Sequence, residues 1–131
     1  MLALQRTTHH TLHALSTALA DLRLSPAEMN VLANLAGGGA LNVSQLSAET
    51  GTKPSTLTNV LDRLTDRGYL TRELDAQDRR SFRLTLTERG TVTAARISAA
   101  IADLERRALA GLSASQLAGF HAALTALEEA S

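Results

Sequence analysis

The sequence has no cysteine, no tryptophan and only a few aromatic residues. The lack of cysteine excludes a disulfide scaffold, a zinc ribbon and a thiol-based redox sensor. Because Tyr69, Phe82 and Phe120 are the only aromatic residues, the core must be built from Leu, Ala, Val and Ile, which fits packed helices. The 131 residues, 44% of them apolar, suffice for one domain with a core.

Long apolar runs and a strong net charge are also missing. The sequence has no apolar run of about 18 residues and no basic-then-apolar leader, so we expect a cytoplasmic protein. The formal net charge is zero, which argues against an indiscriminate nucleic-acid binder. The charge is unevenly distributed, however. Residues 51–90 hold eight basic and six acidic side chains, so this segment alone carries +2.

Motifs of common enzyme classes are absent as well. The chain has no Gly-x-Ser-x-Gly elbow, no phosphate-binding glycine loop and no cysteine nucleophile. Residues 37–39 are three glycines, but the Lys and Ser or Thr of a nucleotide loop do not follow them. We therefore expect a protein that is not an enzyme and that needs no cofactor.

The most informative segment is residues 75–90. It begins with a charged turn, continues with the alternation of apolar and polar residues typical of a strand, and reaches Thr87, a good helix N-cap. Residues 69–74 are a second candidate strand, so a hairpin is predicted with Arg79 and Arg80 at its tip. Arginine is the usual side chain in the narrow, electronegative minor groove of DNA. The alternative is a solvated charged loop. The apolar positions of the strand are Phe82, Leu84 and Leu86.

Residues 42–68 predict two short helices joined by a tight turn. Asn42 suits the N-cap of the first helix, and Gly51 is the residue expected just past its end. The second helix opens at Pro54 and stops at Gly68. At ~1.5 Å per residue it is about 20 Å long, enough to lie in a major groove. On the first helix, the residues expected to face inward are Val43, Leu46 and Ala48.

The second helix has two distinct faces. Leu57, Val60, Leu61 and Leu64 recur at three- and four-residue spacing and form a buried stripe. The remaining faces carry short hydroxyls, an amide and a guanidinium, whereas a merely solvated face is usually rich in Glu and Lys. Such groups donate to and accept from base edges and phosphates. They belong to Ser55, Thr56, Thr58, Asn59 and Arg63.

A helix, a turn, a polar second helix and a basic hairpin together predict a winged helix-turn-helix that binds DNA. Arg63 and Arg72 are expected to hold the DNA backbone, and Ser44 and Gln45 to contact phosphates through exposed N–H groups. The alternative is a winged-helix protein-interaction module that does not touch DNA. Such a module has no use for the wing arginines and the polar face together. The residues expected at the major groove or its phosphates are Lys53, Pro54, Ser55, Thr56, Thr58 and Asn59.

The chain resembles the MarR family of transcriptional regulators. The most specific match is the wing pattern of Asp, one residue, Arg, five residues, Leu-Thr, two residues and Gly. Its members here are Asp78, Arg80, Leu86, Thr87 and Gly90. Residues 42–51 and 55–68 also resemble the family's helix-turn-helix. Lys53 and Pro54 depart from the family, because a small capping hydroxyl often begins the second helix there, so we expect Thr52 to cap it.

The resemblance implies a homodimer that binds a pseudo-palindromic operator, most often as a repressor, and releases it when a ligand or chemical signal arrives. It implies that Arg80 enters the minor groove and that Asp78 holds the basic residues of the wing in position. It also implies a small-molecule effector, such as a phenolic or other aromatic anion. The zero net charge leads us to expect modest non-specific affinity and a dependence on base contacts.

The flanking segments predict further helices. Ser25 and Glu28 fit a capping box, residues 37–39 end the helix it opens, and residues 40–41 fit a short strand beside the wing. Ser113 suits the N-cap of a last helix. The apolar stripes comprise Leu12, Leu15, Leu19 and Leu22, then Val92, Ile97, Ile101, Leu104 and Ala108, then Leu117, Phe120, Leu124 and Leu127.

A winged core alone cannot cover three such stripes, so we expect two copies to bury them in a two-fold dimer. The alternative is a single-chain helical bundle. The predicted fold is mainly α with a small β-hairpin wing. It forms one domain, in which residues 25–90 make the winged helix-turn-helix and residues 1–24 and 91–131 make dimerisation helices.

Histidines on the first helix offer other chemistry. His9 and His13 are four residues apart and so share a helix face that suits Zn²⁺ or Ni²⁺, and His121 of a partner copy would add a ligand. No acidic residue lies within a turn of them, which favours ordinary solvated or partly buried histidines. His13 with Arg6 is an equally open candidate for a small-anion pocket.

Overall fold

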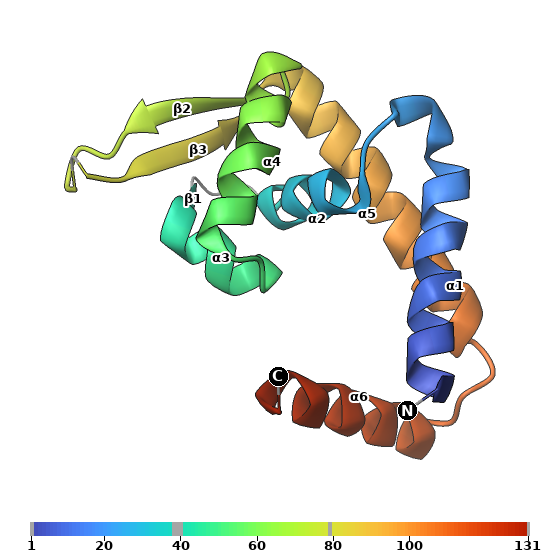
Figure 1. The fold of residues 1–131 in the computed structure, drawn as a ribbon. Helices are drawn as coiled ribbons and strands as arrows, with labels where there is room; N and C mark the ends of the chain where they lie inside the picture. The colour runs from blue at the N-terminus through green and yellow to red at the C-terminus, as the bar shows by residue number, and fades with distance from the viewer. Residues whose placement is uncertain (1, 38–40, 79, 131) are drawn as a thin grey trace. The chain divides into compact units, whose positions relative to one another are not determined.

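Helices dominate the computed structural model, with one small sheet (Figure 1). The structure describes residues 2–37, 41–78 and 80–130. These residues fold as two compact units, Met1–Ala100 and Ile101–Ser131. The predicted positions of Gly38, Gly39, Ala40 and Arg79 lie outside the described residues.

The order of elements is the one that the sequence predicts, a winged helix-turn-helix between flanking helices. The N-terminal stripe is the exception in detail, since its helix ends at Ala18 and a short 3-10 helix follows. The elements are α1 (Leu2–Ala18), η1 (Ala20–Leu22), α2 (Pro26–Leu35), β1 (Leu41–Asn42), α3 (Val43–Thr50), α4 (Pro54–Asp66), β2 (Leu70–Leu74), β3 (Phe82–Leu86), α5 (Glu88–Leu109) and α6 (Ala114–Glu129).

Local capping fixes where the helices begin. Ser25 of α2, Asn42 of α3 and Ser113 of α6 each accept the backbone N–H three residues on, and the side chain there bonds back to the cap. The predicted cap of α4 is wrong. Lys53 rather than Thr52 occupies its N-cap, and no side chain caps it. Proline at the first helical position lacks one of the N–H groups that a helix start leaves without an intrahelical partner.

The wing is an antiparallel hairpin, as predicted, and a third strand joins it. The strand order is β1-β3-β2, with Leu41 opposite Leu84 and Leu70 opposite Leu86. The predicted strand next to the wing therefore exists, in its described residues, as β1. Because alternate residues share a face, Leu70 and Leu84 lie on the buried side of the sheet.

The core of the Met1–Ala100 unit lies among α2, α3, α4, the sheet and the first half of α5. The four residues of the predicted stripe on α4 are all buried. Leucine supplies most of this core, as the shortage of aromatic residues predicts. Its fully buried members are Leu32, Leu46, Leu57, Leu61, Leu64, Leu70, Leu84, Ile97, Val31 and Val60.

One residue that was expected to face inward does not, since Ala48 on α3 is exposed. Several members of the stripes that a second copy is expected to cover are exposed in the single chain, among them Val92 on α5 at 61%. Helix α5 buries Ile97 of the predicted stripe together with Gly90, Thr93 and Ala94. These last three residues are small or polar, so a count of large apolar residues misses them. Other members of the predicted stripes that are exposed are Leu12, Ala108, Phe120, Leu124 and Leu127.

The junction between β3 and α5 explains part of the wing pattern. The Thr87 hydroxyl donates to the Gly68 carbonyl oxygen at 2.6 Å and accepts the Gly90 N–H at 3.0 Å. The Thr87 N–H donates to the Tyr69 carbonyl oxygen at 3.1 Å. A Cβ on residue 90 would lie 1.8 Å from that same oxygen, so only glycine fits there. The Leu-Thr-x-x-Gly part of the pattern thus locks the wing onto α5.

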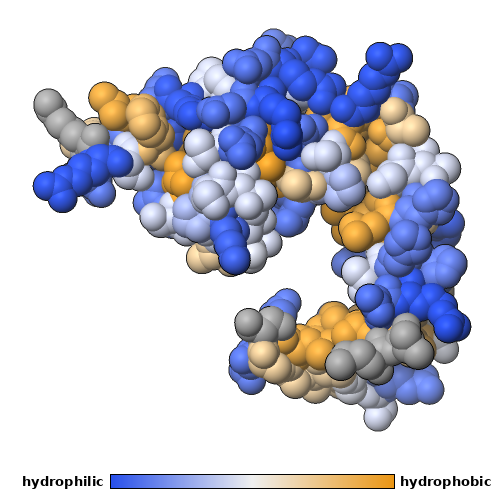
Figure 2. Space-filling model, in the orientation of Figure 1, coloured by the Kyte–Doolittle hydropathy of each residue, from blue (hydrophilic) through white to orange (hydrophobic). Residues whose placement is uncertain are grey.

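The Ile101–Ser131 unit contains the end of α5 and all of α6. None of its described residues is buried, and apolar surface gathers along α6 (Figure 2). Within the described residues, none of the helices has the length and apolar character needed to cross a membrane.

Candidate DNA-binding surface

Helix α3 and the turn after it set the start of α4. Gly51 adopts a left-handed conformation with φ of 64°, which ends α3 as predicted. The Ser47 hydroxyl donates to the Thr52 carbonyl oxygen at 2.7 Å and braces the turn. The sequence predicts that the Gln45 N–H is free to bind a phosphate, and this prediction is wrong. This N–H donates to Asn42 Oδ1 at 2.7 Å, because the capping box uses it. Ser44 is exposed beside it.

The polar face of α4 is exposed where the sequence predicts it. Ser55, Thr56, Asn59 and Arg63 line one hollow of about 320 Å³ next to Ala27 of α2. Four predicted residues, spread over more than two turns of helix, thus share one surface. Lys53, Pro54 and Thr58 are also exposed. The Thr58 hydroxyl donates to the Pro54 carbonyl oxygen at 2.9 Å, so its oxygen remains as an acceptor.

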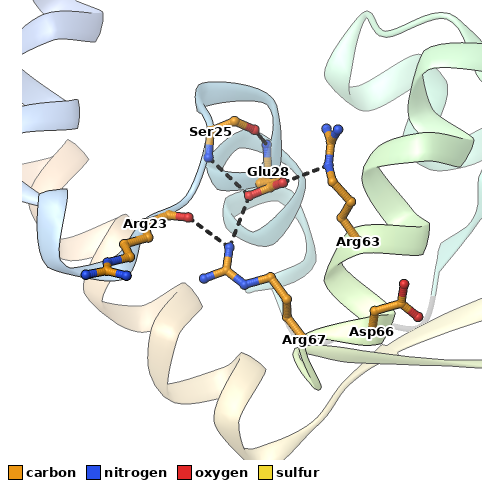
Figure 3. A pocket seen from close by; sticks show the side chains of 6 residues that line it. All are labelled: Arg23, Ser25, Glu28, Arg63, Asp66 and Arg67. Atoms are coloured by element: carbon orange, nitrogen blue, oxygen red, sulfur yellow. Dashed lines mark hydrogen bonds and ion pairs between the residues drawn. The ribbon is translucent and has the colours of Figure 1, made fainter.

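Arg63 and Arg67 converge on Glu28 of α2 (Figure 3). Arg63 Nε donates to Glu28 Oε1 at 3.0 Å, and Arg67 Nη1 lies 3.5 Å from Glu28 Oε2. Arg67 also donates to the carbonyl oxygens of Arg23 and Leu22, at 2.8 and 3.0 Å. Arg67 therefore ties the end of α4 to the segment before α2.

Arg72 on β2 is paired with Asp62 on α4. Its side chain is partly buried, and its Nε is buried with no partner among the described residues. An ion pair with Asp62 competes with any phosphate for this guanidinium. The assignment of Arg72 to the DNA backbone stays a prediction.

The wing tip is organised by two aspartates. Asp78 Oδ1 accepts the Arg80 N–H at 3.0 Å, and the Asp78 carbonyl oxygen accepts the Ser81 N–H at 3.0 Å. Asp75 Oδ1 accepts the Gln77 N–H at 2.9 Å. Arg80 is exposed at this tip. The carboxylate of Asp78 therefore holds the backbone of Arg80, which is the kind of support that the family pattern implies.

Sequence reasoning missed two sets of contacts at this surface, those of Glu28 with arginines and those of Arg89. The capping box signals that Glu28 bonds to Ser25, but nothing local signals that it also binds arginines 35 and 39 residues away. Arg89 lies over the Tyr69 ring at 4.5 Å from the ring centroid and donates to the Arg67 carbonyl oxygen at 2.7 Å. This stack closes the C-terminal end of α4 against α5.

The histidines of α1 are exposed. His9 and His10 meet edge to face with ring centroids 6.2 Å apart. Across the described residues, no group of three or more His, Cys, Asp or Glu side chains is placed to hold a metal ion. The His9–His13 pair stays an untested candidate.

Comparison with known proteins agrees with the geometry. Residues 24–81 match the sequence profile of the MarR family. The HTH-type transcriptional repressor Rv2887 of Mycobacterium tuberculosis is 33% identical over 101 residues, which cover 77% of this chain and 73% of that protein. The HTH-type transcriptional repressor MdtR of Bacillus subtilis is 36% identical over 69 residues. That match covers 53% of this chain and 44% of MdtR, less than half of that protein's length.

The fold has solved counterparts. The structure of the PcaV transcriptional regulator from Streptomyces coelicolor, in complex with its natural ligand, superposes with a TM-score of 0.80 at 27% identity. The match covers 97% of this chain and 90% of PcaV. The helix-turn-helix, the locked wing and a relative matched over most of its length lead to one conclusion. The chain belongs to the MarR family of winged helix-turn-helix transcriptional regulators.

Proposed function

We propose that the protein is a homodimeric repressor that binds a pseudo-palindromic DNA operator in the cytoplasm and releases it when a small effector arrives. The observation that carries the proposal is the shared hollow beside α4. It collects hydroxyl, amide and guanidinium groups on one exposed face, and an exposed arginine stands at the wing tip. Hydroxyls and amides serve base edges, and guanidiniums serve phosphates and the minor groove.

The proposal specifies the chemical class of the effector and not its identity. The PcaV structure was determined with its natural ligand, and this chain shares the fold of PcaV over nearly its whole length. We expect a phenolic or other aromatic anion to weaken DNA binding by this protein. Titrating a panel of hydroxybenzoates into a preformed complex would test this expectation. Unchanged affinity across the panel would remove this class of effector.

Selection of bound sequences from random duplex DNA tests the proposed function. We expect an inverted repeat to be enriched by the purified protein, and we expect the Arg80→Ala variant to enrich it far less. Absence of any enriched motif, together with elution from heparin that does not change in a variant lacking both Arg79 and Arg80, would favour a protein-interaction module instead.

A further inference from the structure

Glu28 is the one buried charged side chain in the described part of the chain, with 5% of its surface exposed. It stands at the third position of α2, in a hollow of about 450 Å³ that is also lined by Arg63 of α4 and by Arg67 just past the end of α4. A buried carboxylate is costly unless charged partners and hydrogen bonds compensate it. A glutamine would serve the capping box alone equally well. The charge therefore has a use beyond the cap.

The two carboxylate oxygens of Glu28 have different partners, which indicates this further use. Oε2 accepts the Ser25 N–H at 3.1 Å and lies near Arg67, while Oε1 accepts Arg63 Nε at 3.0 Å. Arg63 is thus held through its inner nitrogen. Its two terminal nitrogens point away from Glu28 (Figure 3), and 58% of its side chain is exposed.

We propose that Glu28 is a positioning residue for DNA binding, which holds Arg63 so that both terminal nitrogens face a backbone phosphate. The inference rests on the proposed function. A guanidinium presents five donors in a rigid fork, so bonding Nε to Glu28 leaves four donors already oriented. Arg63 also lines the hollow shared with Ser55, Thr56 and Asn59, which places this phosphate contact beside the base-reading face.

The test compares Glu28→Gln, Arg63→Ala and the double variant. Affinity is measured by fluorescence anisotropy at several salt concentrations, with the selected duplex and with a mixed-sequence duplex. Glutamine keeps the capping acceptor but not the charge. We expect Glu28→Gln to weaken binding to both duplexes about threefold to tenfold and to lower the slope of log K against log salt by about one per subunit. Arg63→Ala should do the same. Adding Glu28→Gln to Arg63→Ala should change little more.

Arg67→Ala is the matched control. It removes the other arginine on Glu28 and the tether to Leu22 and Arg23, while the Glu28–Arg63 bond stays. We expect a lower unfolding temperature with an unchanged salt slope. If Glu28→Gln fails to fold, Arg63→Lys takes its place, because a lysine side chain has a single nitrogen and cannot bond Glu28 through an inner nitrogen while a fork of two terminal nitrogens faces the phosphate. It should bind less tightly than the parent.

Three results would overturn the positioning role. Tighter DNA binding by Glu28→Gln would mean that the Glu28 carboxylate weakens binding by repelling the DNA phosphates. Additive losses in the double variant would mean that Glu28 does not act through Arg63. An equal fall in salt slope for Arg67→Ala would mean that any loosening of α2 against α4 has the same effect. If the parent itself bound neither duplex, the proposed function would fail with it.

Discussion

Arg80 is exposed at the wing tip, where the fold holds its backbone and leaves its side chain to solvent. Truncating that side chain removes no described packing contact. We expect Arg80→Ala to weaken operator binding while the dimer and the unfolding temperature stay nearly unchanged, because the minor-groove contact is lost and the hairpin is not. Gel shift and differential scanning calorimetry on one preparation check both halves. Parent-like affinity at physiological salt would remove Arg80 from the interface.

Asn59 stands in the middle of the exposed face of α4, and its amide is suited to a bidentate bond with adenine. We expect Asn59→Ala to relax base preference at one position of each half-site, at a cost of ~1–3 kcal/mol if the bond is bidentate. Competition with single-base operator variants measures this. A uniform loss over all variants would show that Asn59 touches only phosphate.

At the scale of elements, the junction where α5 begins contributes to stability through close backbone packing. The first turn of α5 packs so closely against the backbone of Tyr69, between α4 and β2, that residue 90 has no room for a Cβ. Gly90→Ala should lower the free energy of unfolding by about 3 kcal/mol or more, since backbone must move to relieve the clash. Chemical denaturation measures the loss.

Gly119→Ala on α6 is the matched control for Gly90→Ala. An added Cβ there meets nothing within 4 Å, so we expect no loss and a gain of up to ~1 kcal/mol from helix propensity. Similar effects of the two substitutions would refute the close-packing explanation of the glycine in the wing pattern.

The link between η1 and α5 is an ion pair whose contribution to stability we expect to depend on pH. Arg96 donates to both oxygens of Asp21, at 2.9 and 3.2 Å, and this hydrogen bonding holds the pKa of Asp21 below its ordinary value. A lowered pKa means stability that is fully present above an unfolded-state pKa of about 3.9 and is lost as pH falls toward the folded-state value. Asp21→Asn should therefore lower the unfolding temperature at pH 7, and by less as the pH falls below the unfolded-state pKa. The exposed pair makes the effect small and sensitive to salt.

At the level of elements, the sequence predicts well those features that depend on a few neighbouring residues. Ser25 with Glu28 and Asn42 with Gln45 define helix starts, since each box spans four residues. The alternation after the charged turn defines β3. The buried face of α5 was not predictable in this way, because Gly90 and Thr93 are buried by neighbours distant in sequence. The hydrogen bond between Glu28 and Arg63 was not predictable for the same reason, since the two residues are distant in sequence.

At the scale of the whole molecule, each compact unit leaves apolar side chains at its surface. Leu12 in the first unit is 45% exposed, and Phe120 and Leu124 in the second are 41% and 39% exposed. The sequence predicts these residues as parts of stripes that a second copy covers, and their exposure in one chain supports that view. Sedimentation equilibrium should give a dimer at micromolar concentration. A monomer would contradict it.

A two-fold dimer places its two copies of α4 against half-sites about 34–36 Å apart, one turn of DNA. The most direct test of a dimeric DNA reader is therefore to measure its affinity for operators whose half-sites are moved apart or together by about five base pairs, which is half a turn. Such a change rotates one half-site to the opposite side of the duplex. The account predicts that binding falls to the affinity of a single half-site and recovers when a full turn is inserted. Affinity that is indifferent to half-turn spacing would contradict the dimeric reader.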